Sequence, residues 1–176
     1  KNMLLECKIA DLGTACWTYK QFSHDITTRQ YRAPEVIVQY KYDEKVDIWS
    51  LACLIFELLT GDFLFEPQKE VDKHHITRDI DHLSLMIEIC GSMPKILYTQ
   101  GAQSGQFFNK RHGDLKKIPN IQSLSIKNIL IQDYDFNVQD AIEIETFLLP
   151  LLKLHPKKRT TAQDILQQQE SKTNTW

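Results

Sequence analysis

The 176-residue chain has few of the features that would assign it at once to a broad class. None of its four cysteines (Cys7, Cys16, Cys53 and Cys90) forms a C-x-x-C pair, and each lies among apolar neighbours. We therefore expect buried free thiols and a reducing compartment.

Long apolar runs are also absent. The longest, from Ile48 to Leu59, is broken by Ser50 and Glu57 and falls short of the roughly 18 residues that a membrane span needs. No signal peptide opens the chain, although a chain that begins with Lys1 need not contain its natural start. These absences predict a cytoplasmic and nuclear location with no membrane partner.

Strong charge of one sign is the third absence, because the net charge is only −2. A nucleic-acid footprint usually needs a basic face, so we expect no direct nucleic-acid contact. A weak net charge still allows a local acidic groove that receives a basic partner. With 42% hydrophobic and 25% charged residues, the composition is that of one globular domain, followed by a polar tail over 167–176.

The pattern along the chain predicts a mostly helical fold with one short strand edge. Alternation over 3–10 favours a strand that ends at Asp11, and 11–35 read as a long ordered loop. Residues 62–80 look like an exposed charged loop, and 91–123 are rich in loops. Helices are expected at 43/47–60 with a stop at Gly61, 79/81–90 with a stop at Gly91, 125–132, 137–154 with a kink at Pro150, and a last one to 168 opened by a Thr160-x-x-Gln163 capping box.

The first of these helices is apolar nearly all round, which is typical of a helix in the middle of a larger domain.

Asp11-Leu12-Gly13 is a weak signal alone, since a turn after a strand produces the same tripeptide. Ala33-Pro34-Glu35 follows 20 residues later, preceded by Tyr31-Arg32 and followed by Asp47-Ile48-Trp49-Ser50. This order is that of the second half of the protein-kinase signature.

The motifs resemble those of one kinase branch in particular. The run from Thr28 to Arg32 resembles the CMGC group of Ser/Thr kinases, and Leu12 with Ala15-Cys16-Trp17 is similar to the SR-protein kinases. The likeness extends from about Cys7 to Leu166 through Thr60-Gly61-Asp62, Leu64-Phe65-Glu66-Pro67, Asp81-His82, Gly113-Asp114-Leu115-Lys116 and Phe147-Leu148-Leu149-Pro150.

The resemblance implies a mainly α fold, the incomplete C-terminal (large) lobe of a protein-kinase-like domain with a short β-strand edge at its N-terminus. This partial lobe would cover residues 1–166, with an activation segment at 11–35 and a substrate-docking region at 62–135.

The resemblance also implies chemistry: transfer of phosphate from Mg²⁺-ATP to Ser in Arg/Ser-rich proteins of the mRNA-splicing machinery. Asp11 would bind the metal and so the nucleotide, as the only such ligand in this chain. Thr28 would hydrogen-bond the catalytic carboxylate, the alternative being a bond to its own loop backbone. Arg32 would shape the floor of the acceptor site.

Three residues are implied to be structural anchors. Glu35 should pair with Arg159 in a buried bridge. Asp47 should accept hydrogen bonds from the backbone of a catalytic loop, the alternative being a plain helix cap.

Docking of Arg-rich segments is implied to fall on Asp62, Asp81 and Glu88. Seven acids stand against three bases between residues 62 and 88, and carboxylates accept guanidinium groups bidentately. Charge alone would favour the alternative that these acids form only a solvated helix face. The resemblance favours a docking groove instead. Asp133 replaces a lysine that the family usually carries, so the groove would be more acidic or differently shaped.

Two smaller motifs favour surface roles. His74-His75 lacks a third ligand at useful spacing and reads as an exposed loop. Lys157-Lys158-Arg159 reads as two surface lysines with Arg159 turned inward.

Several parts of a kinase have no counterpart in this sequence: the Gly-rich loop, the strand lysine with its helix glutamate, and the H-R-D catalytic loop. We therefore expect this chain alone to be inactive, and its exposed core to favour self-association or pairing with the missing N-terminal half. The alternative function is a non-catalytic, pseudokinase-like module that docks basic peptides.

Overall fold

The computed structural model describes residues 7–68, 70–71, 76–118 and 120–173. In chain order the elements are η1 (Leu12–Thr14), η2 (Arg29–Tyr31), α1 (Pro34–Ile37), α2 (Lys45–Thr60), β1 (Glu70–Val71), β2 (Ile76–Thr77), α3 (Arg78–Cys90), α4 (Lys95–Gln100), α5 (Ser104–Phe107), α6 (Ile126–Tyr134), α7 (Val138–Leu151), η3 (Pro156–Lys158) and α8 (Ala162–Thr173).

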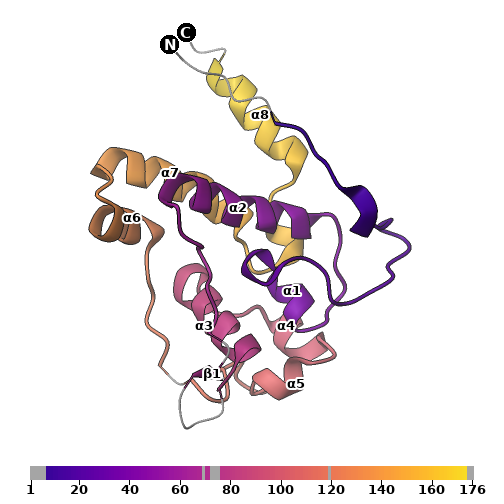
Figure 1. Ribbon diagram of the computed structural model, residues 1–176. Coiled ribbons are helices and arrows are strands. Elements are labelled where there is room, and N and C mark those ends of the chain that lie inside the picture. Colours follow the sequence, from indigo (N-terminus) through magenta and orange to yellow (C-terminus); the bar gives the residue numbers. More distant parts are fainter. Residues whose placement is uncertain (1–6, 69, 72–75, 119, 174–176) are drawn as a thin grey trace.

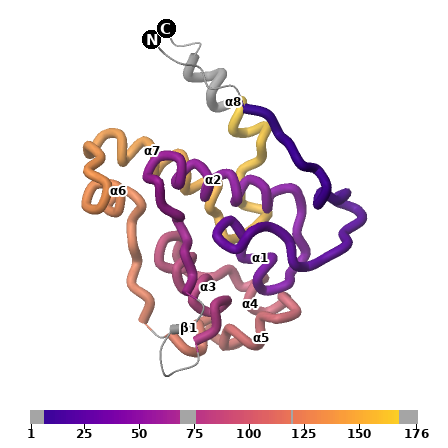
Figure 2. Tube along the Cα trace, in the orientation of Figure 1, coloured from indigo at the N-terminus to yellow at the C-terminus, as the bar shows by residue number. Residues whose placement is uncertain are grey.

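Helices α2 and α7 form the centre of the molecule (Figure 1). Helix α6 packs against α7 at one end, while α3, α4 and α5 lie together on the other side of α2. Helix α8 leads away from this body in both views (Figure 2). In the described part of the chain, no helix is long and apolar enough to cross a membrane.

Helix α2 ends where the sequence predicts, because Gly61 adopts the left-handed conformation (φ 86°) that other residues rarely adopt. Its inner face is fully buried and includes Trp49, Ala52 and Phe56. Its outer face carries Leu54 at 42% exposure and Leu58 at 76%. The helix is therefore buried on one side only, as expected if the domain is incomplete.

The expected loop at 62–80 is more ordered than predicted. Phe65 is fully buried and stacks on Trp49, with ring centroids 5.6 Å apart. Strands β1 and β2 then pair antiparallel, with Glu70 opposite Thr77. The buried ring of Phe65 and the β1–β2 hairpin therefore attach the segment between α2 and α3 to the core.

The predicted start of α3 is wrong by a few residues. Thr77 is the N-cap, and its side chain accepts a hydrogen bond from the backbone N–H of Ile80 at 3.4 Å. Asp79 and Asp81 lie in the first turn instead, where the positive end of the helix dipole stabilises their negative charges. Gly91 ends the helix as predicted.

The last helix also starts one residue later than its predicted capping box. Thr161 and Asp164 form the box: Thr161 Oγ1 accepts from the Asp164 N–H at 3.1 Å, and the Asp164 carboxylate accepts from the Thr161 N–H at 2.8 Å. Helix α8 continues to Thr173, so the predicted tail 167–176 is helical over its described part.

The predicted N-terminal strand is not seen in the described part of the chain. Residues 7–10 have no strand structure, and residues 3–6 lie outside the described residues. Expected burial of the thiols is also only half right. Cys53 and Cys90 are buried and half-buried, but Cys7 and Cys16 are exposed because the segment that carries them has no core packed over it.

Candidate functional site

A hollow of about 510 Å³ lies between the end of the predicted activation segment and helix α2. Thr28 and Tyr31 line one side, and Asp47, Leu51 and Leu54 line the other. Ser50 of α2 holds the two sides together, since its hydroxyl donates to the Tyr31 carbonyl oxygen at 2.9 Å.

Two predicted site residues, Thr28 and Asp47, meet in this hollow. Thr28 is the exposed N-cap of η2 and makes no side-chain cap bond, so the alternative of a local backbone bond is not observed. Among the described residues no donor contacts the Asp47 carboxylate, and Glu44 is the helix N-cap, so Asp47 is no plain cap either. Burial raises the pKa of the Asp47 carboxyl. Both side chains present free hydrogen-bonding groups to the hollow.

Asp11 lies apart from the hollow on the exposed N-terminal segment. Its backbone is left-handed (φ 59°), and its carboxylate accepts only a long bond from the Gly13 N–H at 3.4 Å. Its remaining lone pairs are free, as hard cations such as Mg²⁺ require of an oxygen ligand. In the part of the chain that the structure describes, no three His, Cys, Asp or Glu side chains are placed to hold a metal ion together.

Tyr31 fixes the middle of the segment to α2. Its hydroxyl donates to Glu57 Oε2 at 2.6 Å, and its ring meets Phe63 edge-on at 6.0 Å. The hydrogen bond to Glu57 raises the pKa of Tyr31 to about 12.

Arg32 is held in place by its own segment. It forms an ion pair with Asp25 at 2.6 Å and donates to the Thr27 carbonyl oxygen at 2.8 Å. Burial, followed by the nearby Arg29, lowers the pKa of the Arg32 guanidinium. Arg29 pairs with Asp79 of α3 and so connects the segment to a second helix.

His82 of α3 is fully buried, near enough to these arginines to be affected by their charges. Within the described residues neither ring nitrogen has a hydrogen-bond partner. Burial lowers the pKa of His82 to about 3, assisted by the positive charges of Arg29, Arg32 and Arg78. The ring is therefore a neutral core group that packs beside Phe65.

The pairing predicted between Glu35 and Arg159 is present. Arg159 donates to both carboxylate oxygens, at 2.6 and 2.9 Å, and both side chains are fully buried. Arg159 also donates to the carbonyl oxygens of Lys153 and Lys45, and its guanidinium lies 5.1 Å from the Trp49 ring centroid. The bridge joins the end of the activation segment to the α7–α8 connection.

The three predicted docking residues fall into two places. Asp62 is exposed at the end of α2, where its carboxylate accepts from the Tyr134 hydroxyl at 3.0 Å. Burial and this hydrogen bond raise the pKa of Tyr134, to which Asp133 also contributes. The departure at Asp133 therefore adds negative charge beside Asp62.

Asp81 and Glu88 are brought together on α3, as their spacing predicts. Burial, followed by the charge of Asp81, raises the pKa of the Glu88 carboxyl. The backbone of Glu88 accepts from the Leu124 N–H at 2.8 Å, which holds the segment before α6 against the same helix. Asp81 itself accepts from the Gln68 N–H at 2.8 Å.

The other charges counted in the docking region differ from expectation. Asp79 is occupied by Arg29, and Arg78 Nε donates to the Pro67 carbonyl oxygen at 3.1 Å. Lys69, Asp72, Lys73 and the His74-His75 pair lie outside the described residues.

Sequence reasoning missed the roles of Arg29 and His82. Both residues belong to the motifs that carry the resemblance, but the sequence does not show that Arg29 pairs with Asp79 or that His82 packs beside Phe65.

Comparison with known proteins gives a consistent result. Residues 1–169 match the family described as Protein kinase domain. "Serine/threonine-protein kinase SRPK" of Physarum polycephalum is 49% identical over 161 residues, which is 91% of this chain and 37% of the relative. "SRSF protein kinase 3" of Mus musculus is 44% identical over 163 residues, 93% of this chain and 28% of the relative.

A third relative, "Serine/threonine-protein kinase SKY1" of Saccharomyces cerevisiae, is 44% identical over 159 residues, 90% of this chain and 21% of the relative. The chain thus spans between about a fifth and two fifths of the length of these relatives.

Proposed function

Since this chain belongs to the protein kinase family, in its SR-protein kinase branch, we propose that the whole protein is a Ser/Thr kinase that phosphorylates Ser in Arg/Ser-rich proteins. The observation that carries the proposal is the hollow that Thr28 and Asp47, from two separate segments, both line with exposed side chains that have no hydrogen-bond partner among the described residues. A catalytic loop supplied from outside this chain would satisfy both.

Bound Mg²⁺-ATP would supply the phosphoryl group and neutralise its charge. In this chain, Asp11 is the residue that would hold the metal, because its carboxylate oxygens are largely free. Thr28 would orient the catalytic carboxylate from across the hollow. Arg32, fixed by Asp25 and the Thr27 carbonyl, would form the floor against which the acceptor segment lies.

Substrate docking would use the carboxylates of Asp62, Asp81 and Glu88. A guanidinium is a planar fork that two carboxylate oxygens can match, so successive arginines would bind along these acids. The raised pKa of Glu88 is consistent with this role: burial is the larger cause and the charge of Asp81 adds to it, and a bound arginine would compensate both effects. Such substrates suggest a link to mRNA splicing and a cytoplasmic and nuclear location.

The chain by itself is the second candidate: a catalytically silent part of the lobe that still docks basic peptides. This candidate is favoured for the isolated chain because nothing among the described residues donates a hydrogen bond to Asp47 in the hollow. Kinase activity would then require the remainder of the protein.

A phosphorylation assay tests the first candidate. The full-length protein, given ATP, Mg²⁺ and an Arg/Ser-repeat peptide, should incorporate phosphate into serine. Asp11→Ala should remove nearly all incorporation, whereas Glu143→Ala, which removes an exposed carboxylate on α7 outside the docking region, should leave it unchanged. Absence of incorporation, or equal activity in the Asp11→Ala protein, rules out the proposed function.

A further inference from the structure

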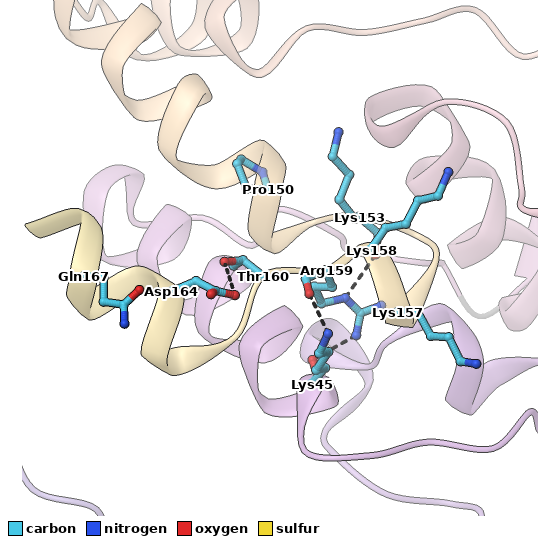
Figure 3. Close-up of a pocket in the computed structure, with 9 residues that line it drawn as sticks. All are labelled: Lys45, Pro150, Lys153, Lys157, Lys158, Arg159, Thr160, Asp164 and Gln167. Carbon is cyan, nitrogen blue, oxygen red and sulfur yellow. Dashed lines mark hydrogen bonds between the residues drawn. The ribbon is translucent and has the colours of Figure 1, made fainter.

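A basic hollow of about 580 Å³ opens on the side of the molecule where α8 begins (Figure 3). Its lysines come from three separate places: Lys45 from α2, Lys153 from the turn after α7, and Lys157 and Lys158 from η3. The sequence shows only the last two as neighbours. The fold therefore gathers four positive charges that the sequence pattern does not connect.

Little negative charge offsets these lysines. Among the described residues, Asp164 is the one carboxylate in the lining, and it accepts from the N–H and hydroxyl groups of Thr161 at 2.8 and 2.7 Å. Lys45 Nζ donates to the Arg159 carbonyl oxygen at 2.9 Å. Hydrogen bonds from Thr161 and, to a smaller extent, the charge of Lys45 lower the pKa of the Asp164 carboxyl, so Lys45 and Asp164 offset one another in part. Arg159 itself is neutralised by Glu35.

The remaining three lysines are free to meet a ligand. In the described part of the chain, no carboxylate lies within ion-pair distance of Lys153, Lys157 or Lys158. Lys153 and Lys158 extend in the same general direction, while Lys157 points away from them (Figure 3). Lys153 and Lys158 are thus the pair best placed to act together.

The side chains that line the hollow limit the classes of ligand that it can bind. Lysine ammonium groups are hydrated point charges on flexible stems, so they suit a chain of several anions better than one phosphate held in fixed geometry. Among the described residues no aromatic side chain lines the hollow, so nucleic-acid bases would have no stacking surface.

We propose that the basic hollow binds an anionic segment of a protein partner, in which phosphoserines or acidic residues are clustered. This interaction is of opposite charge to the proposed docking of arginines on α3. It does not depend on the proposed kinase activity.

Peptide binding to the full-length protein tests the proposal. The probe is a fluorescein-labelled peptide with four consecutive phosphoserines between glycines and no arginine, so that the acidic residues of α3 do not attract it. Fluorescence anisotropy at about 50 and 200 mM salt gives affinity and its salt dependence, since screening weakens exposed charge pairs.

Lys153→Ala/Lys158→Ala should weaken binding about tenfold and reduce the salt dependence. Lys95→Ala/Lys110→Ala is the matched control: it removes the same charge from exposed lysines elsewhere and should change affinity less than about twofold. All four lysines are exposed, so equal melting temperatures are expected and would show that every variant folds.

A second peptide, with glutamates in place of the phosphoserines, distinguishes the two sources of charge. Tighter binding of the phosphopeptide supports a phosphorylated partner, and equal binding supports an acidic one. Unchanged phosphopeptide affinity in the Lys153→Ala/Lys158→Ala protein would overturn the proposal. So would a single-stranded RNA of equal charge that binds more tightly than both peptides. The kinase assay is separate, so failure of either proposal is recognised independently.

Discussion

Arg159 and Glu35 are separated by 124 residues in sequence, and their side chains form a bidentate ion pair with no exposure to solvent. The pair joins the end of the segment 11–35 to the turn before α8. Its loss would leave one charge buried without its partner, which costs far more than an exposed ion pair does.

Glu35→Gln should therefore lower the free energy of unfolding by about 3–5 kcal/mol, because the Arg159 guanidinium stays buried with its charge uncompensated. Urea denaturation of the full-length protein measures this change. Glu143→Gln on the exposed face of α7 is the control and should change stability by less than about 0.5 kcal/mol. A loss below about 1 kcal/mol for Glu35→Gln would mean that water compensates the arginine.

The buried ring of His82 should make stability depend on acidic pH. Its pKa is about 3 in the folded chain against an ordinary value of 6.5, so the unfolded chain binds the proton first. The neutral ring's contribution is complete above pH 6.5 and is lost as the pH falls towards 3, at up to about 1.4 kcal/mol per pH unit.

Replacing His82 by Leu should flatten this dependence, which thermal unfolding between pH 7 and about pH 4 can measure. His112→Gln, at an exposed position, should leave the slope as it is. Equal slopes in the His82→Leu and unmodified proteins would show that other groups control the acid transition.

Glu88 should show opposite effects on stability and on binding. Burial and Asp81 raise its pKa, so its contribution to stability is complete below its ordinary value of 4.5 and declines as the pH rises through the folded-state value. At neutral pH, Glu88→Gln should therefore raise the melting temperature slightly. The same change should weaken binding of an Arg/Ser peptide by about tenfold, because a charge-assisted hydrogen bond is lost.

Calorimetry and peptide titration together measure these two effects. Asp140→Asn on α7 removes an equal charge away from α3 and serves as the control for binding. An Arg/Ser peptide that binds the Glu88→Gln protein as tightly as the unmodified protein would exclude Glu88 from docking.

The exposed face of α2 should control self-association of the isolated chain. Leu54 and Leu58 are 42% and 76% exposed on a helix whose other face is core, and such a surface favours burial against another chain. Leu58→Lys should shift the chain from oligomer towards monomer in light scattering. Leu166→Lys, at a 60% exposed leucine of α8, should have little effect. A monomeric unmodified chain would contradict this expectation.

Local signals in the sequence predicted the helices well. Gly61 and Gly91 end α2 and α3 as expected, because each adopts a positive φ that other residues rarely adopt. Ser125 and Asn137 cap α6 and α7, and their side chains satisfy backbone N–H groups within the same turn. Such interactions involve neighbouring residues only and can be recognised without the fold.

Features that depend on distant partners were harder to predict. The burial of Phe65 comes from stacking on Trp49, and the cap of α3 moved to Thr77 because a hairpin positions that residue. The Glu35–Arg159 pair was predictable by resemblance, whereas the basic hollow that Lys45 and Lys153 both line depends on how α2 and α7 pack. No periodicity along the chain encodes that arrangement.

The position of Trp49 gives this lobe an optical reporter. The indole is fully buried between the Phe65 ring and the Arg159 guanidinium, whereas Trp17 is 66% exposed. Trp49 should emit at short wavelength and Trp17 at the long wavelength typical of indole in water. The third tryptophan, Trp176, lies outside the described residues and would be replaced by Phe. Fluorescence would then separate loss of the core, which shifts the short-wavelength emission of Trp49, from rearrangement of the segment that carries Trp17, which changes only the long-wavelength emission.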